Sequence, residues 1–201
     1  MKVITTYAIV ILLTLAIWEC GVRPIVAPLP LVAEGPAAER DNEELARLYA
    51  EDQADRKPND GQEIDWKVVL PRDRNREARV KELYEKGKLR TGKDYYHVAM
   101  VLQHAAKPED FLLAHELCIV AIAKGEKKHA LWLAAASEDR FLMHLDRPQR
   151  FGTQYRGGPK NEPIRLYKVG AGVTDALRKE FHAPTLAEAK AREAMFNKKP
   201  R

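Results

Sequence analysis

Residues 95–145 read YYHVAMVLQHAAKPEDFLLAHELCIVAIAKGEKKHALWLAAASEDRFLMHL, and this stretch decides the fold class. Apolar residues recur at helical spacing throughout it, and the pattern breaks at Lys107-Pro108 and at Gly125. Proline in the first turn of a helix and glycine just after the last turn commonly mark helix boundaries. The stretch therefore predicts three helices, over residues 95–106, 108–125 and 127–145, joined by short turns.

The sequence before this stretch predicts further helices. Asn42 opens a helical pattern over residues 43–56, and Asp73 or Asn75 can cap a helix that runs to about Lys86 and stops at Gly87. Between them, residues 64–70 form a short apolar stretch ahead of Pro71, which we interpret as a strand or a packed loop. The helices within residues 77–145 are expected to form two antiparallel hairpins, similar to those of helical-repeat proteins.

The sequence after residue 150 changes character. Residues 151–163, FGTQYRGGPKNEP, are rich in glycine and proline and predict a structured loop. Residues 164–169 are expected to be a short strand or extended segment. Two short helices follow over residues 173–181 and 185–196, and Thr185 with Glu188 forms a capping box at the start of the second.

The composition agrees with a mainly all-α fold. The chain has 201 residues, of which 45% are hydrophobic, 31% charged and only 7% aromatic. A core poor in aromatic residues favours helices over a β-sandwich. The net charge of +5 is spread over segments of mixed sign, so we expect no nucleic-acid partner. We predict one helical domain over residues 42–198.

A separate apolar run, VITTYAIVILLTLAIW, occupies residues 3–18 directly after Lys2. A basic residue followed by a short apolar segment is typical of a signal peptide, and the run is slightly short for a membrane span. We interpret residues 1–20 as a signal peptide or membrane anchor and residues 21–41, which contain several prolines, as a tether. Cys20 also suggests lipidation, although Glu19 before it argues against this. The domain is expected to be exported or membrane-anchored, outside the cytoplasm.

Polar residues interrupt the apolar pattern of residues 127–145. Glu138, Asp139 and Arg140 together cover about 200° of the helix, so Asp139 or Arg140 is expected to point partly inward. Such a residue forms either a structural ion pair or cap, or the polar floor of a ligand site. The following segment, RPQRFGTQ (residues 147–154), has groups that either cap helices or recognise carboxylate or phosphate. We expect it to fold back, with Arg150 or Gln154 contacting the helices, and both Asp139→Ala and Arg150→Ala to be destabilising.

The histidines do not predict a metal site. His97 and His104 are seven residues apart on one helix, too far to share a metal ion, and His115-Glu116 lacks the second histidine of a zinc-protease motif. His104 follows Gln103 near a helix end, where the helix dipole favours a charged imidazole. Motifs for nucleotide cofactors and for familiar hydrolases are also lacking, so we predict no cofactor.

Four polar segments occur in a fixed order: ELARLYAEDQADR (residues 44–56), VLQHA (101–105), EDR (138–140) and PQRFGTQ (148–154). In these segments the chain resembles a bacterial family, domain of unknown function 6624, whose pattern often has tyrosine where this chain has Phe151. The resemblance implies a helical fold and brings no known activity. The candidate polar site consists of Asp52, Gln53, Arg56, Gln103, His104, Asp139, Arg140, Gln149, Arg150, Thr153 and Gln154.

Two functional hypotheses follow. The first is a helical module outside the cytoplasm that binds a peptide or protein through its hairpin surface. The alternative is a small-ligand receptor or enzyme whose pocket joins His104, Asp139, Arg140 and Arg150, with His104 as general acid or base. The two hypotheses differ in whether the polar residues line an open concavity or are sealed by mutual hydrogen bonds.

Overall fold

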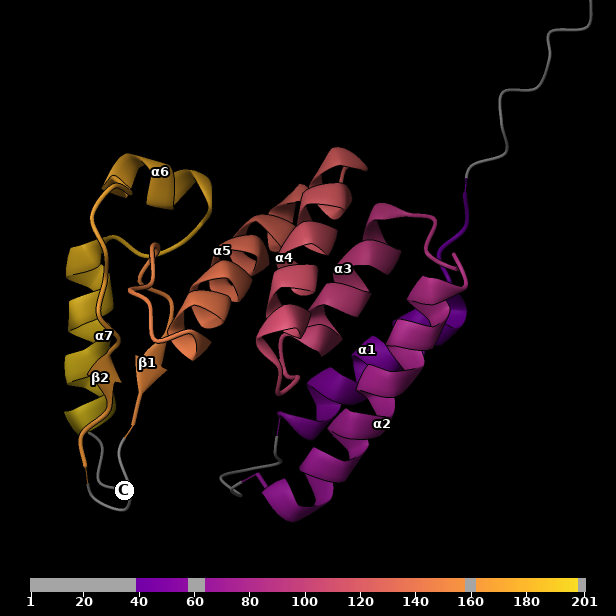
Figure 1. Cartoon of the computed structure of the whole chain (residues 1–201), viewed down its shortest axis with the longest axis horizontal. Helices are drawn as coiled ribbons and strands as arrows, with labels where there is room; N and C mark the ends of the chain where they lie inside the picture. The colour runs from indigo at the N-terminus through magenta and orange to yellow at the C-terminus, as the bar shows by residue number, and fades with distance from the viewer. Residues whose placement is uncertain (1–38, 58–63, 158–161, 199–201) are drawn as a thin grey trace, which may run out of the picture. The chain divides into compact units, whose positions relative to one another are not determined.

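The computed structural model describes residues 39–57, 64–157 and 162–198, which form a mainly helical unit (Figure 1). The predicted all-α class is confirmed. The predicted anchor and most of the tether lie outside the described residues. None of the helices in the described ranges is long and apolar enough to span a bilayer. In chain order the elements are α1 (Glu43–Asp55), α2 (Trp66–Glu85), α3 (Gly92–Leu102), α4 (Pro108–Ala123), α5 (Lys127–His144), β1 (Tyr155–Arg156), β2 (Arg165–Leu166), α6 (Asp175–Glu180) and α7 (Leu186–Lys198).

The starts of α1 and α3 are capped and tied together. Asn42 caps α1 by accepting a hydrogen bond from the Glu44 amide at 3.0 Å. Thr91 and Asp94 form a capping box at α3. One oxygen of the Asp94 carboxylate accepts the Thr91 amide within this capping box, and the other accepts the Asn42 amide at 2.8 Å. One buried carboxylate therefore fixes the starts of both helices.

Helix α2 begins earlier than the sequence predicted. Residues 66–70 are helical, so their assignment to a strand or packed loop is wrong, and Pro71 lies inside the helix. Asp65 caps this start through a 3.0 Å hydrogen bond from the Lys67 amide. The missing N–H of Pro71 costs one hydrogen bond in the second turn, and the burial of Val69 on the inner face of the helix offsets part of that cost.

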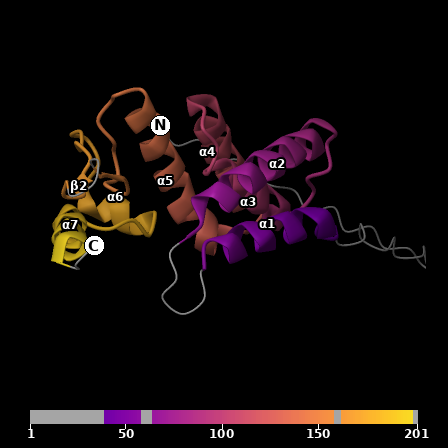
Figure 2. The same ribbon diagram turned by 90° about the horizontal axis from the view of Figure 1, so that it is seen from below.

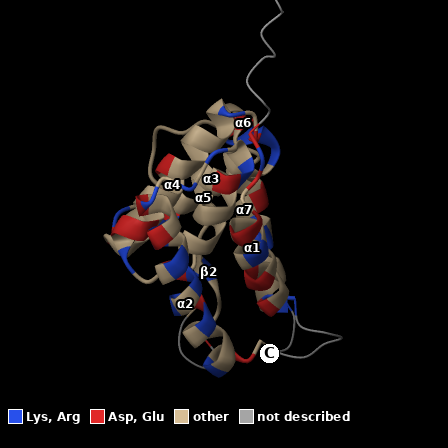
Figure 3. Ribbon diagram, turned by 90° about the vertical axis from the view of Figure 1, so that its right-hand side faces the viewer, with Lys and Arg blue, Asp and Glu red and all other residues tan. Residues whose placement is uncertain are grey.

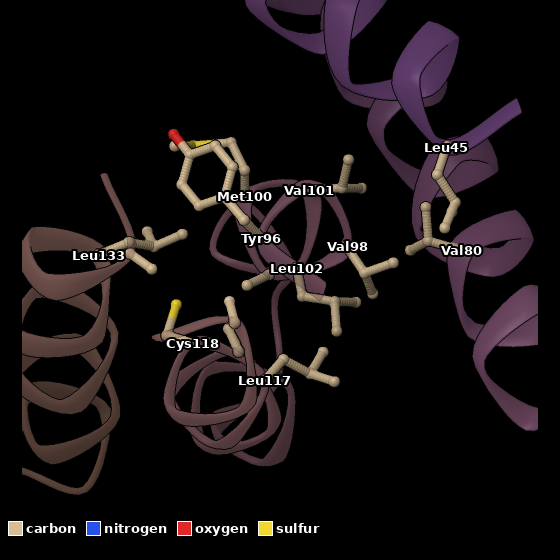
Figure 4. Close-up of a cluster of buried hydrophobic side chains, with 14 of the residues drawn as sticks. Leu45, Val80, Tyr96, Val98, Met100, Val101, Leu102, Leu117, Cys118 and Leu133 are labelled. Atoms are coloured by element: carbon tan, nitrogen blue, oxygen red, sulfur yellow. The ribbon is translucent and has the colours of Figure 1, made fainter. Parts of the chain in front are cut away.

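The main core surrounds α3, whose residues Val98, Ala99 and Leu102 are completely buried. Figure 4 shows side chains from α1 and α2 on one side of α3 and from α4 and α5 on the other. Cys118 lies in this cluster and is buried, as expected of a small apolar residue. Burial of apolar area from five helices is the main stabilising contribution to the unit.

The hairpins predicted within residues 77–145 are confirmed. Helices α3, α4 and α5 follow one another through short turns, with extensive contacts between α3 and α4 and between α4 and α5. Gly92 at the start of α3 approaches the α4–α5 turn so closely that a Cβ atom there would lie 3.0 Å from the Ala121 carbonyl oxygen. Helix α3 ends at Leu102, four residues before the predicted end.

The C-terminal part packs on α5. Strands β1 and β2 pair antiparallel, with Tyr155 opposite Leu166, and β2 lies within the predicted extended segment. The capping box of Thr185 and Glu188 precedes α7 as predicted. Figures 1 and 2 agree that α5 lies between α4 and the C-terminal elements. Helix α5 therefore contributes one side to the main core and another to a second cluster that contains Phe151 and Val173.

Candidate functional site

Asp139, on α5, holds the segment 147–154 against the helices. Its completely buried carboxylate accepts hydrogen bonds from the amides of Arg150 at 2.6 Å, Phe151 at 2.9 Å and Thr153 at 3.0 Å. A fourth hydrogen bond, 2.8 Å long, comes from the Thr153 hydroxyl. These bonds satisfy the buried charge with backbone and hydroxyl donors. The predicted folding back of this segment is therefore confirmed.

Arg178 holds the opposite, carbonyl side of the same segment. The side chain is 2% exposed and donates to the carbonyl oxygens of Arg150 at 3.0 Å, Phe151 at 3.2 Å and Val173 at 2.7 Å. This role of Arg178 was not predicted from the sequence. The sequence gives no clear signal for it, because four of the six residues of α6 are charged and Arg178 does not stand out among them.

Gln149 and Gln154 complete the packing of the segment. The Gln149 amide group donates to the Gln154 carbonyl at 3.0 Å and the Tyr167 carbonyl at 2.8 Å, and it accepts the Gln154 amide at 2.8 Å. Gly152 has a φ of +80°, a conformation that residues with a side chain rarely adopt. This part of the candidate site is sealed by its own hydrogen bonds, which indicates a structural role.

A second polar network joins α1 to α2. Arg56 donates to the Asp52 carboxylate at 2.8 Å and to Asp73 at 2.7 Å, and Arg76 donates to Asp73 at 2.6 Å. Gln53 also donates to Asp52, at 2.8 Å. Asp73 and Arg76 were not among the predicted site residues. Of the two, Asp73 had been considered only as a helix cap.

His104 lies beside this network, just after the end of α3. Its Nε2 atom is 3.7 Å from a carboxylate oxygen of Asp52. Burial, together with the nearby cations Arg56 and Arg140, lowers the pKa of His104 to about 3, so the expectation of a charged imidazole is wrong. Desolvation and two cations outweigh the effect of the helix dipole. Burial likewise raises the pKa of Asp52 to about 6.

Arg140 connects the two networks. Its Nε atom donates to the side-chain oxygen of Gln154 at 3.2 Å, and Nη1 donates to the backbone carbonyl of Gln103. The guanidinium also lies over the Phe111 ring, 5.9 Å from its centroid. Burial and the charge of Arg56 lower its pKa.

No carboxylate of the described residues lies within ion-pair distance of Arg140. Every other buried or half-buried cation in these ranges has such a partner; these cations are Arg56, Arg76, Arg79, Lys81 and Arg178. Both acceptors of Arg140 are neutral oxygens, so no carboxylate in the described ranges neutralises its positive charge. A guanidinium on a residue of intermediate exposure, without a described carboxylate partner, is suited to bind an anion that reaches it.

The predicted site residues thus divide into groups. Asp139, Gln149, Thr153 and Gln154 build the sealed segment, while Asp52, Gln53, Arg56 and His104 gather at the ends of α1 and α3, with Arg140 between the two groups. Gln103 contributes its backbone carbonyl to Arg140. The Arg150 side chain does not join either group. It is half-exposed and lies 3.4 Å from Glu138.

Within the described ranges, no three His, Cys, Asp or Glu side chains are arranged to bind a metal ion. Comparison with known proteins gives no match to a family model, a curated protein or a solved structure.

Asp139→Ala is expected to destabilise the protein by about 3–5 kcal/mol, because it leaves several buried donors without a partner. For a unit of this size the melting temperature falls on the order of 10 °C. Thermal unfolding followed by circular dichroism measures this.

The matched controls are Glu138→Ala and Arg150→Ala, which remove only a partly exposed ion pair and leave the Arg150 amide intact; each is expected to change stability by less than about 1 kcal/mol. The structure thereby revises the expectation for Arg150→Ala. Equal losses in Asp139→Ala and Arg150→Ala would show that the side chain of Arg150 holds the segment.

His104 predicts a pH dependence of stability. Its pKa in the folded protein, about 3, lies below the ordinary value of 6.5, so between these values the unfolded chain binds more protons and acid weakens the fold. Asp52, with its raised pKa of about 6, has the opposite effect between pH 3.8 and about 6, where stability falls as pH rises.

In the native chain, His104 and Asp52 change the stability in opposite directions as the pH rises. In His104→Gln only the effect of Asp52 remains. The stability of the native chain relative to this variant should therefore rise by about 1 kcal/mol per pH unit between about pH 4 and 6. Denaturant unfolding across this range measures the difference, with His129→Gln at an exposed position as control. A difference that does not change with pH would contradict the assignment of a neutral, buried His104.

Proposed function

We propose that this domain binds a peptide or protein ligand that presents a carboxylate, and that Arg140 receives this carboxylate. The N-terminal apolar segment serves in this proposal as the export signal or anchor that brings the domain outside the cytoplasm. The observation that carries the proposal is the partly exposed Arg140, which has two neutral acceptors and no carboxylate partner among the described residues.

The energetics favour an anionic ligand. Taking a cation partly out of water costs free energy that only a counter-charge or strong acceptors return. At Arg140 the neighbouring charge of Arg56 adds to this cost, and both lower the pKa of the guanidinium. A bound carboxylate would offset both effects through charge-assisted hydrogen bonds, for which the planar guanidinium is well suited.

The surroundings favour a peptide as the source of the carboxylate. Phe111, whose ring lies against Arg140, begins a stretch of α4 in which Leu112, Ile119 and Val120 are 37%, 53% and 36% exposed. Their spacing of seven and eight residues places them along one side of the helix. An extended or helical peptide has both a carboxylate and the apolar side chains that such a surface would accept.

Binding is better supported than acid–base catalysis. With a pKa of about 3, His104 is a weak proton acceptor at neutral pH. The carboxylate of Asp139 accepts hydrogen bonds from the backbone of the segment, and the side chain of Arg150 lies beside Glu138. The described contacts therefore do not join His104, Asp139, Arg140 and Arg150 in the pocket that the catalytic alternative requires.

A titration with defined probes tests the proposal. The full chain in detergent micelles is titrated with an N-acetylated trileucine peptide, with the same peptide amidated at its C-terminus, and with inorganic phosphate, while amide NMR signals are recorded. We expect the free carboxylate to shift the signals of Gln103, Arg140 and Gln154, and the amidated peptide to bind about 10- to 100-fold more weakly, since a charge-assisted hydrogen bond contributes about 1.5–3 kcal/mol. Tighter binding of phosphate would point to a phosphorylated ligand instead.

Arg140→Gln should lose this preference for the free carboxylate, Arg140→Lys should keep part of it, and Arg150→Gln should keep all of it. Circular dichroism confirms that each variant is folded. Equal binding of the free and amidated peptides, or an unchanged preference in Arg140→Gln, would refute the proposal.

A further inference from the structure

The first one and a half turns of α2 carry large apolar side chains on the surface. Trp66 is 51% exposed, Val68 43% and Leu70 50%, while Val69 between them is buried against the core. Trp66 and Leu70 are one turn apart and lie on the same side of the helix. Exposing this much apolar area at one helix end is costly in water unless another surface covers it.

Basic residues surround these side chains. Lys67 and Arg74 are exposed, lie within about 100° of Trp66 around the helix, and make no ion pair with a described carboxylate. Arg72 is also exposed and pairs with Asp55. Figure 3 shows the blue basic positions along the lower, N-terminal half of α2. We call Trp66, Lys67, Leu70 and Arg74 the α2 patch.

We propose that the α2 patch docks on the surface of an anionic lipid bilayer. Tryptophan prefers the boundary between headgroups and acyl chains, where its ring is buried and its N–H remains hydrated. Leu70 adds apolar area at the same depth. Lys67 and Arg74 can extend their charged ends to lipid phosphates while their aliphatic parts cover the apolar residues.

Charge complementarity selects the lipid surface over another protein. Near an anionic membrane, each lysine or arginine contributes about 1 kcal/mol of attraction, so two cations favour the docked state by about 30-fold. A patch that combines one tryptophan, an aliphatic residue and cations that pair with no described carboxylate has the composition of interfacial membrane-binding helices. Among the nearby described carboxylates, Asp55 and Asp73 are both paired with arginines. The exposed Asp65, which caps the start of α2, has no described cation partner and offsets part of this attraction.

This inference is independent of Arg140. It concerns exposed residues at the start of α2, whereas Arg140 lies on α5, and it requires only that the domain meets a membrane surface. The apolar segment of residues 3–18 gives a separate reason to expect such a meeting, and two weak membrane signals together give more stable attachment than either alone.

Tryptophan fluorescence of the full chain tests the inference. The chain has three tryptophans, Trp18, Trp66 and Trp132. Replacing Trp18 and Trp132 by phenylalanine leaves Trp66 as the only reporter. The chain is added to phosphatidylcholine vesicles with and without phosphatidylglycerol, each containing brominated phosphatidylcholine as a quencher. We expect a blue shift and strong quenching of Trp66 in the anionic vesicles and little change in the neutral vesicles.

Reversing the charges with Lys67→Glu and Arg74→Glu should weaken docking by about 30-fold or more and abolish the quenching. The same reversal at the exposed Lys127 and Lys128 should leave it unchanged. A chain in which Trp132 is the only tryptophan should remain accessible to a water-soluble quencher. The inference is overturned if Trp66 stays equally accessible in water and anionic vesicles, if charge reversal has no effect, or if Trp66 is shielded without vesicles, which would indicate contact between copies of the chain.

Discussion

The arrangement of the site depends on one buried carboxylate. Asp139 accepts three backbone amides and a hydroxyl from residues 150–153, so a single side chain of α5 fixes the path of the segment that follows it. The buried Arg178 fixes the carbonyl groups of the same segment from the other side. Opposite charges thus hold opposite edges of one stretch of backbone, and neither charge remains without partners in the low-dielectric interior.

Because the hydrogen bonds of Asp139 are all used by the segment, its carboxylate does not pair with the next residue, Arg140. Arg140 projects about 100° away around the helix, and the adjacent carboxylate is already saturated by the segment it holds. Gln154, which the segment brings back to α5, supplies only a neutral oxygen. Among the described residues, the arrangement that holds the loop therefore leaves the neighbouring Arg140 without a carboxylate partner, and this is the cation that we propose to receive an anion.

Helix existence could be predicted because it depends on local sequence. Periodic apolar residues, with helix boundaries marked by Gly87, Pro108 and Gly125, indicated α3, α4 and α5. The four ordered polar segments indicated side chains that the structure brings together. The contact between residues 147–154 and α5 followed from the cost of burying an unpaired charge. Gln154 contacts Arg140 as predicted. Arg150 also contacts Asp139, but through its backbone amide and not through its side chain, which the sequence could not show.

The remaining differences between prediction and structure concern contacts between elements that are distant in the sequence, which the apolar periodicity of single helices does not predict. The ion pairs of Asp73 and Arg76 with α1 depend on how α2 crosses that helix, and burial of Arg178 depends on a segment about 28 residues away. Pro71 suggested a boundary because proline usually ends or begins a helix, but Asp65 capped the helix earlier and Val69 was buried. The lowered pKa of His104 required knowledge of the cations that α1 and α5 place beside it.

Hydrogen exchange of the amides of Arg150, Phe151 and Thr153 tests the central role of Asp139 most directly. If the buried carboxylate holds these amides, they exchange only when the whole unit unfolds, as slowly as the core amide of Leu133. Exchange as fast as that of the exposed loop residue Gly172 would contradict the account, because the segment would then open without unfolding of α5 and Asp139 would not fix its path.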